Sequence, residues 1–174
     1  METNTAKTSI REIKQMAKKN ISSTHMFSKN IPSLGIIAIK DPIKRKFVSE
    51  GISAIGLGAI IIGNSESMNI PNIVCVEKIS QNDLIGFDFF VFDNEHEGVD
   101  ITQYMKVGIV PIMPEKNVFS GMLREFNPMK FEGNGFFWNS ESPYCIFQKV
   151  VAYTENIKFP EDRRVLLKNI MGTF

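Results

Sequence analysis

The chain has 174 residues, 43% of them hydrophobic and 22% charged, and its formal net charge at pH 7 is +1. This length and composition are typical of a single globular domain spanning residues 1–174. The near-neutral charge argues against nucleic acid or an anionic membrane as a partner. The chain begins with a polar stretch instead of a signal peptide, and no apolar run reaches bilayer length, so we expect a cytoplasmic protein with reduced cysteines.

The hydrophobic pattern predicts helices and short buried strands that alternate along the chain. An amphipathic helix is expected at 8–20, followed by a strand at 34–39. Asp41 is expected to cap the next helix, with Pro42 at its first position. The remaining pattern predicts strands at 58–63, 72–79 and 87–93, a short helix at 99–108, strands at 109–113 and 135–138, and closing helices at 142–157 and 160–172.

Strands that are hydrophobic throughout, and that alternate with helices, are typical of a parallel sheet covered on both faces. The sequence therefore predicts an α/β fold, a single Rossmann-like domain with helices on both faces of the sheet. Ligands of such sheets bind beyond the carboxyl ends of the strands. Function is accordingly expected in the segments 40–46, 63–69, 93–98, 113–122 and 131–135.

Two clusters of charge are candidates for chemistry in these segments. In "IKDPIKRK", Lys40 ends the first predicted strand and Lys44, Arg45 and Lys46 lie in the next predicted helix. These cations are placed to meet a phosphate, or they belong to a solvated helix face. In "FDNEHEGVD", the carboxylates of Asp93, Glu95, Glu97 and Asp100 are suited to a metal, to sugar hydroxyls or to acid–base work. Alternatively, they belong to a polar loop in which Asp100 and its neighbours cap the next helix. With only two histidines in the chain, no zinc site is expected.

The sequence lacks the motifs of several common classes of enzyme and binding site. There is no G-x-G-x-x-G after the first predicted strand and no Walker loop, so dinucleotide binding and P-loop chemistry are unsupported. There is no G-x-S-x-G for a serine hydrolase. A receiver domain with Asp93 as phospho-acceptor is disfavoured, because the acidic pair expected after the first strand is reduced to Asp41.

Three stretches, "HEGVDITQYMKVGIVPIM", "REFNP" and "FEGNGFFW", resemble the carboxy-terminal half of bacterial glycogen and starch synthases. The family's run E-P-C-G-L-T-Q-M-Y-A-M-R-Y-G-T-V-P lies without a gap on residues 95–111. Its D-F-N-P then falls on 125–128, and its E-G-T-G-F-x-F matches 132–138 in kind. The resemblance implies the second Rossmann-like half of a GT-B glycosyltransferase, which binds ADP- or UDP-glucose.

The resemblance also implies roles for individual charged residues. Lys40 and Arg45 have the spacing of the family's phosphate-binding R-x-x-x-x-K, with the residue types exchanged. The family's glutamate falls on Glu95 when counted back from Gly98, and on Glu97 when counted forward along the strand. These two glutamates are the catalytic candidates, and the resemblance assigns them to the ribose or the sugar.

Three further positions are implied to line the donor site. The family's G-G-L turn falls on residues 117–119, so Asn117 brings a side chain to a place where bare backbone normally approaches the ligand. Gly133 and Gly135 resemble the family's glycine turn beside the donor.

The functional expectation is a non-catalytic binding or interaction module related to this donor-binding half. The alternative is the donor-binding subunit of a split hexosyltransferase that uses ADP- or UDP-glucose. The expected partners are a nucleotide-sugar and either an acceptor-domain protein or a second copy of the chain. No cofactor is required, and we expect no transferase turnover by this chain alone, since a GT-B active site is a cleft between two domains.

Overall fold

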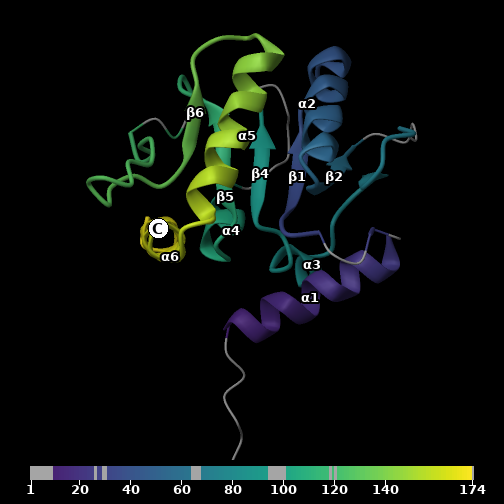
Figure 1. Ribbon diagram of the computed structural model, residues 1–174, viewed down its shortest axis with the longest axis horizontal. Helices are drawn as coiled ribbons and strands as arrows, with labels where there is room; N and C mark the ends of the chain where they lie inside the picture. Colours follow the sequence, from purple (N-terminus) through teal and green to yellow (C-terminus); the bar gives the residue numbers. More distant parts are fainter. Residues whose placement is uncertain are drawn as a thin grey trace, which may run out of the picture.

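The structure is a computed structural model that describes residues 10–25, 27–28, 31–63, 68–93, 101–117, 119 and 121–173. Within these residues, six strands form one sheet in the order β3-β2-β1-β4-β5-β6 (Figure 1). Every neighbouring pair in the sheet is parallel. The strands are β1 (Leu34–Ala38), β2 (Gly58–Ile62), β3 (Ile73–Val76), β4 (Phe89–Phe92), β5 (Val110–Pro114) and β6 (Phe136–Trp138). The predicted α/β, Rossmann-like fold is confirmed.

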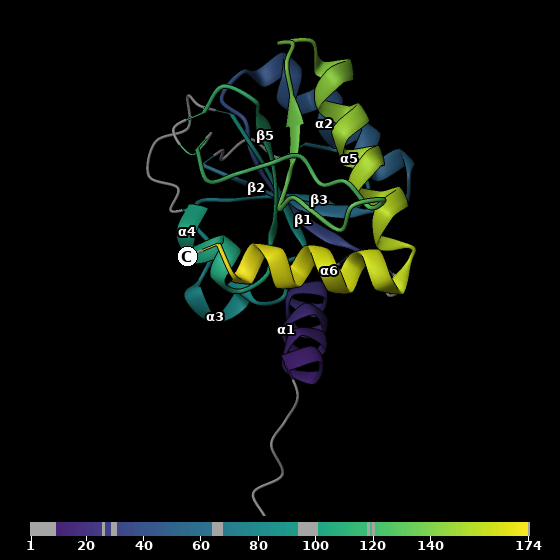
Figure 2. The same ribbon diagram turned by 90° about the vertical axis from the view of Figure 1, so that its left-hand side faces the viewer.

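Helices cover both faces of the sheet, as the sequence predicts. Figure 2 shows α2 and α5 on one face and α4 on the other, while α1 lies beyond the end of the sheet at which the strands begin. The helices are α1 (Ile10–Thr24), α2 (Pro42–Ala54), α3 (Gln81–Leu84), α4 (Ile101–Lys106), α5 (Pro143–Ile157) and α6 (Pro160–Met171). None of the described helices has both the length and the apolar character needed to cross a membrane.

The core is centred on β1 and β4. Ile36 of β1 pairs with Ile60 on one side and with Phe90 on the other. Every residue of β1, β4 and β5 is buried. Because helices pack on both faces, neither face of these strands meets water, and this explains why their sequences are apolar throughout instead of alternating.

The structure differs from the expected elements in detail. The short helix α3 was not predicted; Ser80 caps it by accepting a hydrogen bond from the Asp83 N–H at 3.2 Å. The strand expected at 87–93 begins only at Phe89. Its expected second residue, Asp88, instead lies at the entrance to the strand and accepts hydrogen bonds through its side chain.

Candidate functional site

The strand order of the sheet reverses between β1 and β4. From β1 the chain moves outward through β2 to β3, and it then returns to place β4 on the other side of β1. In open parallel sheets this reversal leaves a crevice beyond the carboxyl ends of the two central strands, where ligands bind. The segments that reach this crevice begin at Ile39 after β1 and at Asp93 after β4.

Arg45 reaches this crevice from the second turn of α2. Its Nη1 donates to the carbonyl oxygens of Ile39 and Lys40, at 3.1 and 3.3 Å. Its Nε is buried and has no hydrogen-bond partner among the described residues. The guanidinium therefore holds the end of β1, while its buried Nε–H is unused among the described residues.

Asp93 approaches the same point from the end of β4. Its Oδ2 accepts a hydrogen bond from the Lys40 N–H at 2.7 Å, while its Oδ1 is buried without a partner among the described residues. The Lys40 side chain between these groups is exposed. The structure thus places Lys40, Arg45 and Asp93, which the sequence analysis named in two separate clusters, at one point. Glu95 and Glu97 lie outside the described residues.

The beginning of α2 offers little to an anion. Asp41 caps the helix as predicted, and its carboxylate accepts from the N–H groups of Ile43 and Lys44 at 2.8 and 3.1 Å. Pro42 has no N–H, and the Arg45 N–H donates to the Asp41 carbonyl. The hydrogen bond from Lys44 holds the pKa of the Asp41 carboxyl below its usual value. The amides that grip phosphate in many Rossmann-like domains are therefore used within the chain.

Asn117 has a role within the fold. Its Nδ2 donates to the Pro114 carbonyl at 2.6 Å, and its Oδ1 accepts from the Phe119 N–H at 2.7 Å. These bonds fix the turn that follows β5. Asn117 therefore lies at the carboxyl edge of the sheet. It follows β5, the outer neighbour of β4, and so it is not at the crevice between β1 and β4.

Gly133 and Gly135 lie at the opposite edge, because they precede β6 in an all-parallel sheet. Gly133 has φ +91°, and a Cβ added there would lie 2.1 Å from the Glu125 carbonyl oxygen. A Cβ on Gly135 would lie 2.9 Å from side-chain atoms of Phe137 and Pro111. Both glycines are therefore required by close packing inside the chain. The structure does not bring them together with Lys40 and Arg45.

Asn134, between these glycines, secures the same turn. It is 8% exposed. Its Oδ1 accepts from the Arg124 N–H at 2.8 Å, and its Nδ2 donates to Met122 O and Thr173 Oγ1. The stretch "FEGNGFFW" is thus a tight turn that leads into β6, and Asn134 joins this turn to the segment before it and to the end of α6.

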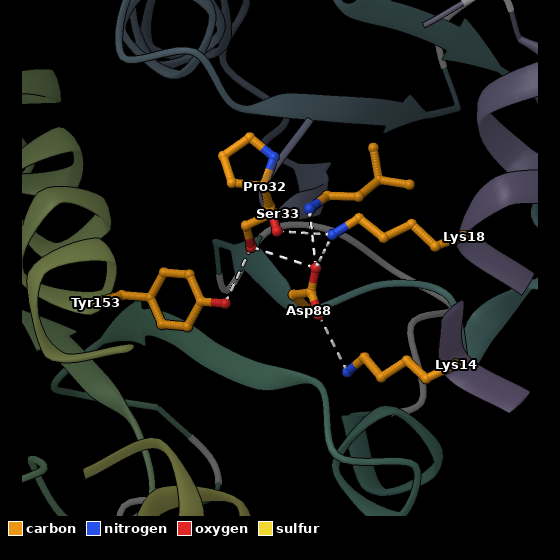
Figure 3. Close-up of polar contacts among 7 residues, drawn as sticks. Lys14, Lys18, Pro32, Ser33, Asp88 and Tyr153 are labelled. Carbon is orange, nitrogen blue, oxygen red and sulfur yellow. Dashed lines mark hydrogen bonds and ion pairs between the residues drawn. The ribbon is translucent and has the colours of Figure 1, made fainter. Parts of the chain in front are cut away.

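A buried ionic cluster, absent from the sequence-based predictions, lies at the amino edge of β1 and β4 (Figure 3). Asp88 is 8% exposed, and its Oδ2 accepts from Lys18 Nζ at 2.8 Å and from the Leu34 N–H at 3.0 Å. Lys14 Nζ lies 3.3 Å from Oδ1. Ser33 Oγ donates to Asp88 Oδ2 at 3.3 Å. We call these residues, together with Tyr153, the Asp88 cluster.

The Asp88 cluster binds α1 to the sheet and to α5. The Tyr153 hydroxyl lies 3.1 Å from Ser33 Oγ, and burial raises the pKa of this phenol far above its usual value. Burial lowers the pKa of Lys14, against the attraction of Asp88. The pKa of Asp88 is lowered: burial opposes its ionisation, but the two lysines and the hydrogen bonds outweigh that effect. Each polar group of the Asp88 cluster has a partner, so this arrangement fits a structural role in holding α1 against the sheet.

No group of three or more histidine, cysteine, aspartate or glutamate side chains is arranged to hold a metal ion in the described part of the chain.

Comparison with known proteins shows the fold. No protein-family model and no curated protein matches the sequence. Among solved structures, the chain is similar to the spinosyn forosaminyltransferase SpnP, with a TM-score of 0.54 and 9% identity, over 83% of this chain and 41% of that one. The chain spans less than half of that protein's length. The similarity shows a glycosyltransferase-like fold of the kind found in the Rossmann-like halves of GT-B enzymes, and at 9% identity it shows the fold alone.

Proposed function

We propose that this chain is a glycosyltransferase-like binding module that holds a nucleotide-sugar beyond the carboxyl ends of β1 and β4 and does not catalyse transfer by itself. One observation carries this proposal. Arg45 Nε and Asp93 Oδ1 are buried at the reversal of strand order, and neither has a partner among the described residues. A buried polar atom without a partner is costly, so a ligand that pairs with both atoms gains free energy.

The chemistry of these groups suits a ligand that combines phosphate and hydroxyl groups. The Nε–H of Arg45 is a cationic donor, and the exposed ammonium of Lys40 adds a second positive charge for a diphosphate. The Asp93 carboxylate is an acceptor that fits a ribose or sugar hydroxyl. Glu95 and Glu97 follow Asp93 in the chain and stay candidates for the same hydroxyls.

The beginning of α2 favours binding over catalysis. Because Asp41 occupies the amides of the first turn, side chains alone hold the diphosphate. Stabilising a departing nucleotide calls for fixed donors, and backbone amides are more rigid than a lysine side chain. The alternative is the donor-binding subunit of a split hexosyltransferase, with an acceptor-domain partner. The 41% coverage of the similar glycosyltransferase is compatible with that arrangement.

Calorimetric titration with ADP-glucose, UDP-glucose, ADP and UDP tests the proposal. We expect saturable binding of at least one of these ligands, weakened about tenfold in Lys40→Ala, since one charge-assisted contact contributes roughly 1.5 kcal/mol. Lys46→Ala is the matched control, because Lys46 is exposed on α2, which begins two residues after Lys40, and it lies 3.9 Å from the carboxylate of Glu50. Absence of binding at millimolar ligand contradicts the proposal.

A second assay addresses catalysis. The purified chain is incubated with radiolabelled ADP-glucose or UDP-glucose and glycogen as acceptor, and incorporation into the polymer is measured. We expect no incorporation above the rate in buffer. Hexosyl transfer that disappears in Lys40→Ala but persists in Lys46→Ala would contradict the non-catalytic part of the proposal and favour an enzyme.

A further inference from the structure

A groove of about 700 Å³ lies beside the edge strand β6, and its volume is in the range of small-molecule sites. It is bounded by the segment after β5, by residues 123–125 and by the first half of α5. Asn117, whose side chain holds the turn after β5, forms part of one wall. All of its lining residues belong to the described part of the chain, and none is shared with the crevice beyond β1 and β4.

Four polar side chains that line this groove are free to bind a ligand. Glu115, Arg124, Asn139 and Gln148 are exposed, and their side chains make no hydrogen bond or ion pair with other described residues. They come from four parts of the chain: the segment after β5, the segment before β6, the segment after β6 and helix α5. Together they offer the donors of a guanidinium and two amides, and the acceptors of a carboxylate and two amides.

The charges that line the groove cancel. Glu125 pairs with Lys149 at 2.8 Å and also accepts from the Phe137 N–H at 2.6 Å. This leaves one acidic and one basic side chain, Glu115 and Arg124, facing a ligand. An anion such as a diphosphate would meet two carboxylates here, and a cation would meet two basic groups. The groove therefore favours a neutral ligand with many hydrogen-bonding groups.

The remaining lining is apolar. The ring of Phe137 is partly exposed, and Leu123 lies buried nearby in the wall. An aromatic face carries partial negative charge and attracts the polarised C–H groups of a flat ligand. A pyranose ring has such a C–H face together with hydroxyls that donate and accept, so it matches both parts of the lining.

We propose that this groove binds a neutral oligosaccharide, at a site distinct from the nucleotide-sugar site at β1 and β4. The inference goes beyond the proposed function and does not depend on it, because the two sites share no residue. It assigns Phe137 as the platform for one sugar ring, and Asn139, Gln148 and Glu115 as the partners of its hydroxyls.

The test is a titration of the isotopically labelled chain with maltotetraose and, separately, with cellotetraose, followed by amide chemical shifts. We expect saturable shifts of the Asn139 and Gln148 side-chain amides with at least one of these probes. Asn139→Ala and Gln148→Ala should each weaken binding about three- to tenfold, which corresponds to one lost hydrogen bond. Gln81→Ala, an exposed amide on α3, is the matched control and should leave the affinity unchanged.

Three results would overturn the inference. These are the absence of saturable shifts at the groove with both tetrasaccharides, equal affinity in the wild type and in both groove variants, and stronger shifts at the groove with inorganic phosphate than with either sugar. UDP-glucose supplies an independent readout. Shifts that it causes at Lys40 and Arg45 report only on the nucleotide-sugar site, so the two proposals succeed or fail separately.

Discussion

The ammonium group of Lys18 lies 2.8 Å from the buried carboxylate of Asp88. The same ammonium donates to the Pro32 carbonyl at 2.8 Å, so one side chain of α1 contacts the entrances to both β1 and β4. These strands define the crevice at their other ends. The position of α1 and the alignment of the two central strands are therefore tied to a single carboxylate, and Asp88 is the residue whose loss should matter most to the stability of this end of the fold.

Replacing Asp88 with asparagine should lower the free energy of unfolding by roughly 2–4 kcal/mol. The change leaves Lys14 and Lys18 largely buried without their counter-charge. Urea denaturation followed by circular dichroism measures the effect. Glu50→Gln, which removes an exposed carboxylate, is the control and should change stability by no more than about 0.5 kcal/mol. Equal stability of the two variants would show that the Asp88 cluster contributes nothing.

The same carboxylate should govern acid sensitivity. Because the pKa of Asp88 is lower in the folded protein than in the unfolded chain, its contribution is fully present above about pH 4 and is lost as the pH falls through the folded-state pKa. Unfolding free energies measured from pH 6 down to pH 2 should therefore fall less steeply in Asp88→Asn than in the wild type. Parallel curves for the two proteins would rule out this assignment.

Tyr153 should make the fold sensitive to alkali. Its pKa is raised by burial, so above about pH 10 the tyrosine of the unfolded chain loses its proton while the folded one keeps it, and stability falls as the pH rises. In Tyr153→Phe this part of the decline should vanish. Thermal unfolding of both proteins between pH 8 and 11 measures it. Lys14 is present in both proteins, so its effect cancels when the stability of the variant is subtracted from that of the wild type. A Tyr153→Phe protein whose stability falls as steeply with rising pH as that of the wild type would contradict the prediction.

Gly133→Ala should destabilise the protein by at least about 2 kcal/mol. The residue has φ +91°, and the added methyl group would lie 2.1 Å from the Glu125 carbonyl oxygen. Gly121→Ala is the matched control, since no atom lies within 4 Å of its Cβ position and its φ is not positive. Chemical denaturation of both variants distinguishes them. A Gly133→Ala protein as stable as the control, but defective in nucleotide binding, would restore the ligand-contact role that the sequence predicts.

Most of the fold could be predicted from local pattern. The continuous apolar runs of the strands report burial on both faces, and Asp41 followed by Pro42 marks the start of α2 through chemistry confined to neighbouring residues. The four-residue helix α3 was not predicted, because so short a segment has no periodicity to detect. The strand expected at 87–93 ends one residue earlier, at Phe92, and it begins two residues later, at Phe89, because Asp88 was counted into an apolar run.

The site was predictable only in part. The proximity of Lys40 to Arg45 could be predicted, because their spacing within one strand–helix unit is local. The Asp88 cluster depends on contacts such as that of Asp88 with Lys18, separated by 70 residues, and no single-sequence pattern reports such pairs. A signal was nevertheless present: Asp88 is the one charge inside "GFDFFVF". The glycines of the turn before β6 were singled out as donor-site residues, and the packing of Gly133 against Glu125 was not foreseeable.

The hydrogen bond from the Phe137 N–H to Glu125 Oε2 also bears on whether another chain can add to the edge of the sheet. β6 ends the sheet, and an edge strand with a free amide is a template onto which another polypeptide can add. The Glu125 carboxylate occupies this amide at 2.6 Å and places a negative charge where an incoming backbone carbonyl would have to lie. The Glu125 side chain, which also lines the groove, thereby disfavours the addition of another strand at Phe137.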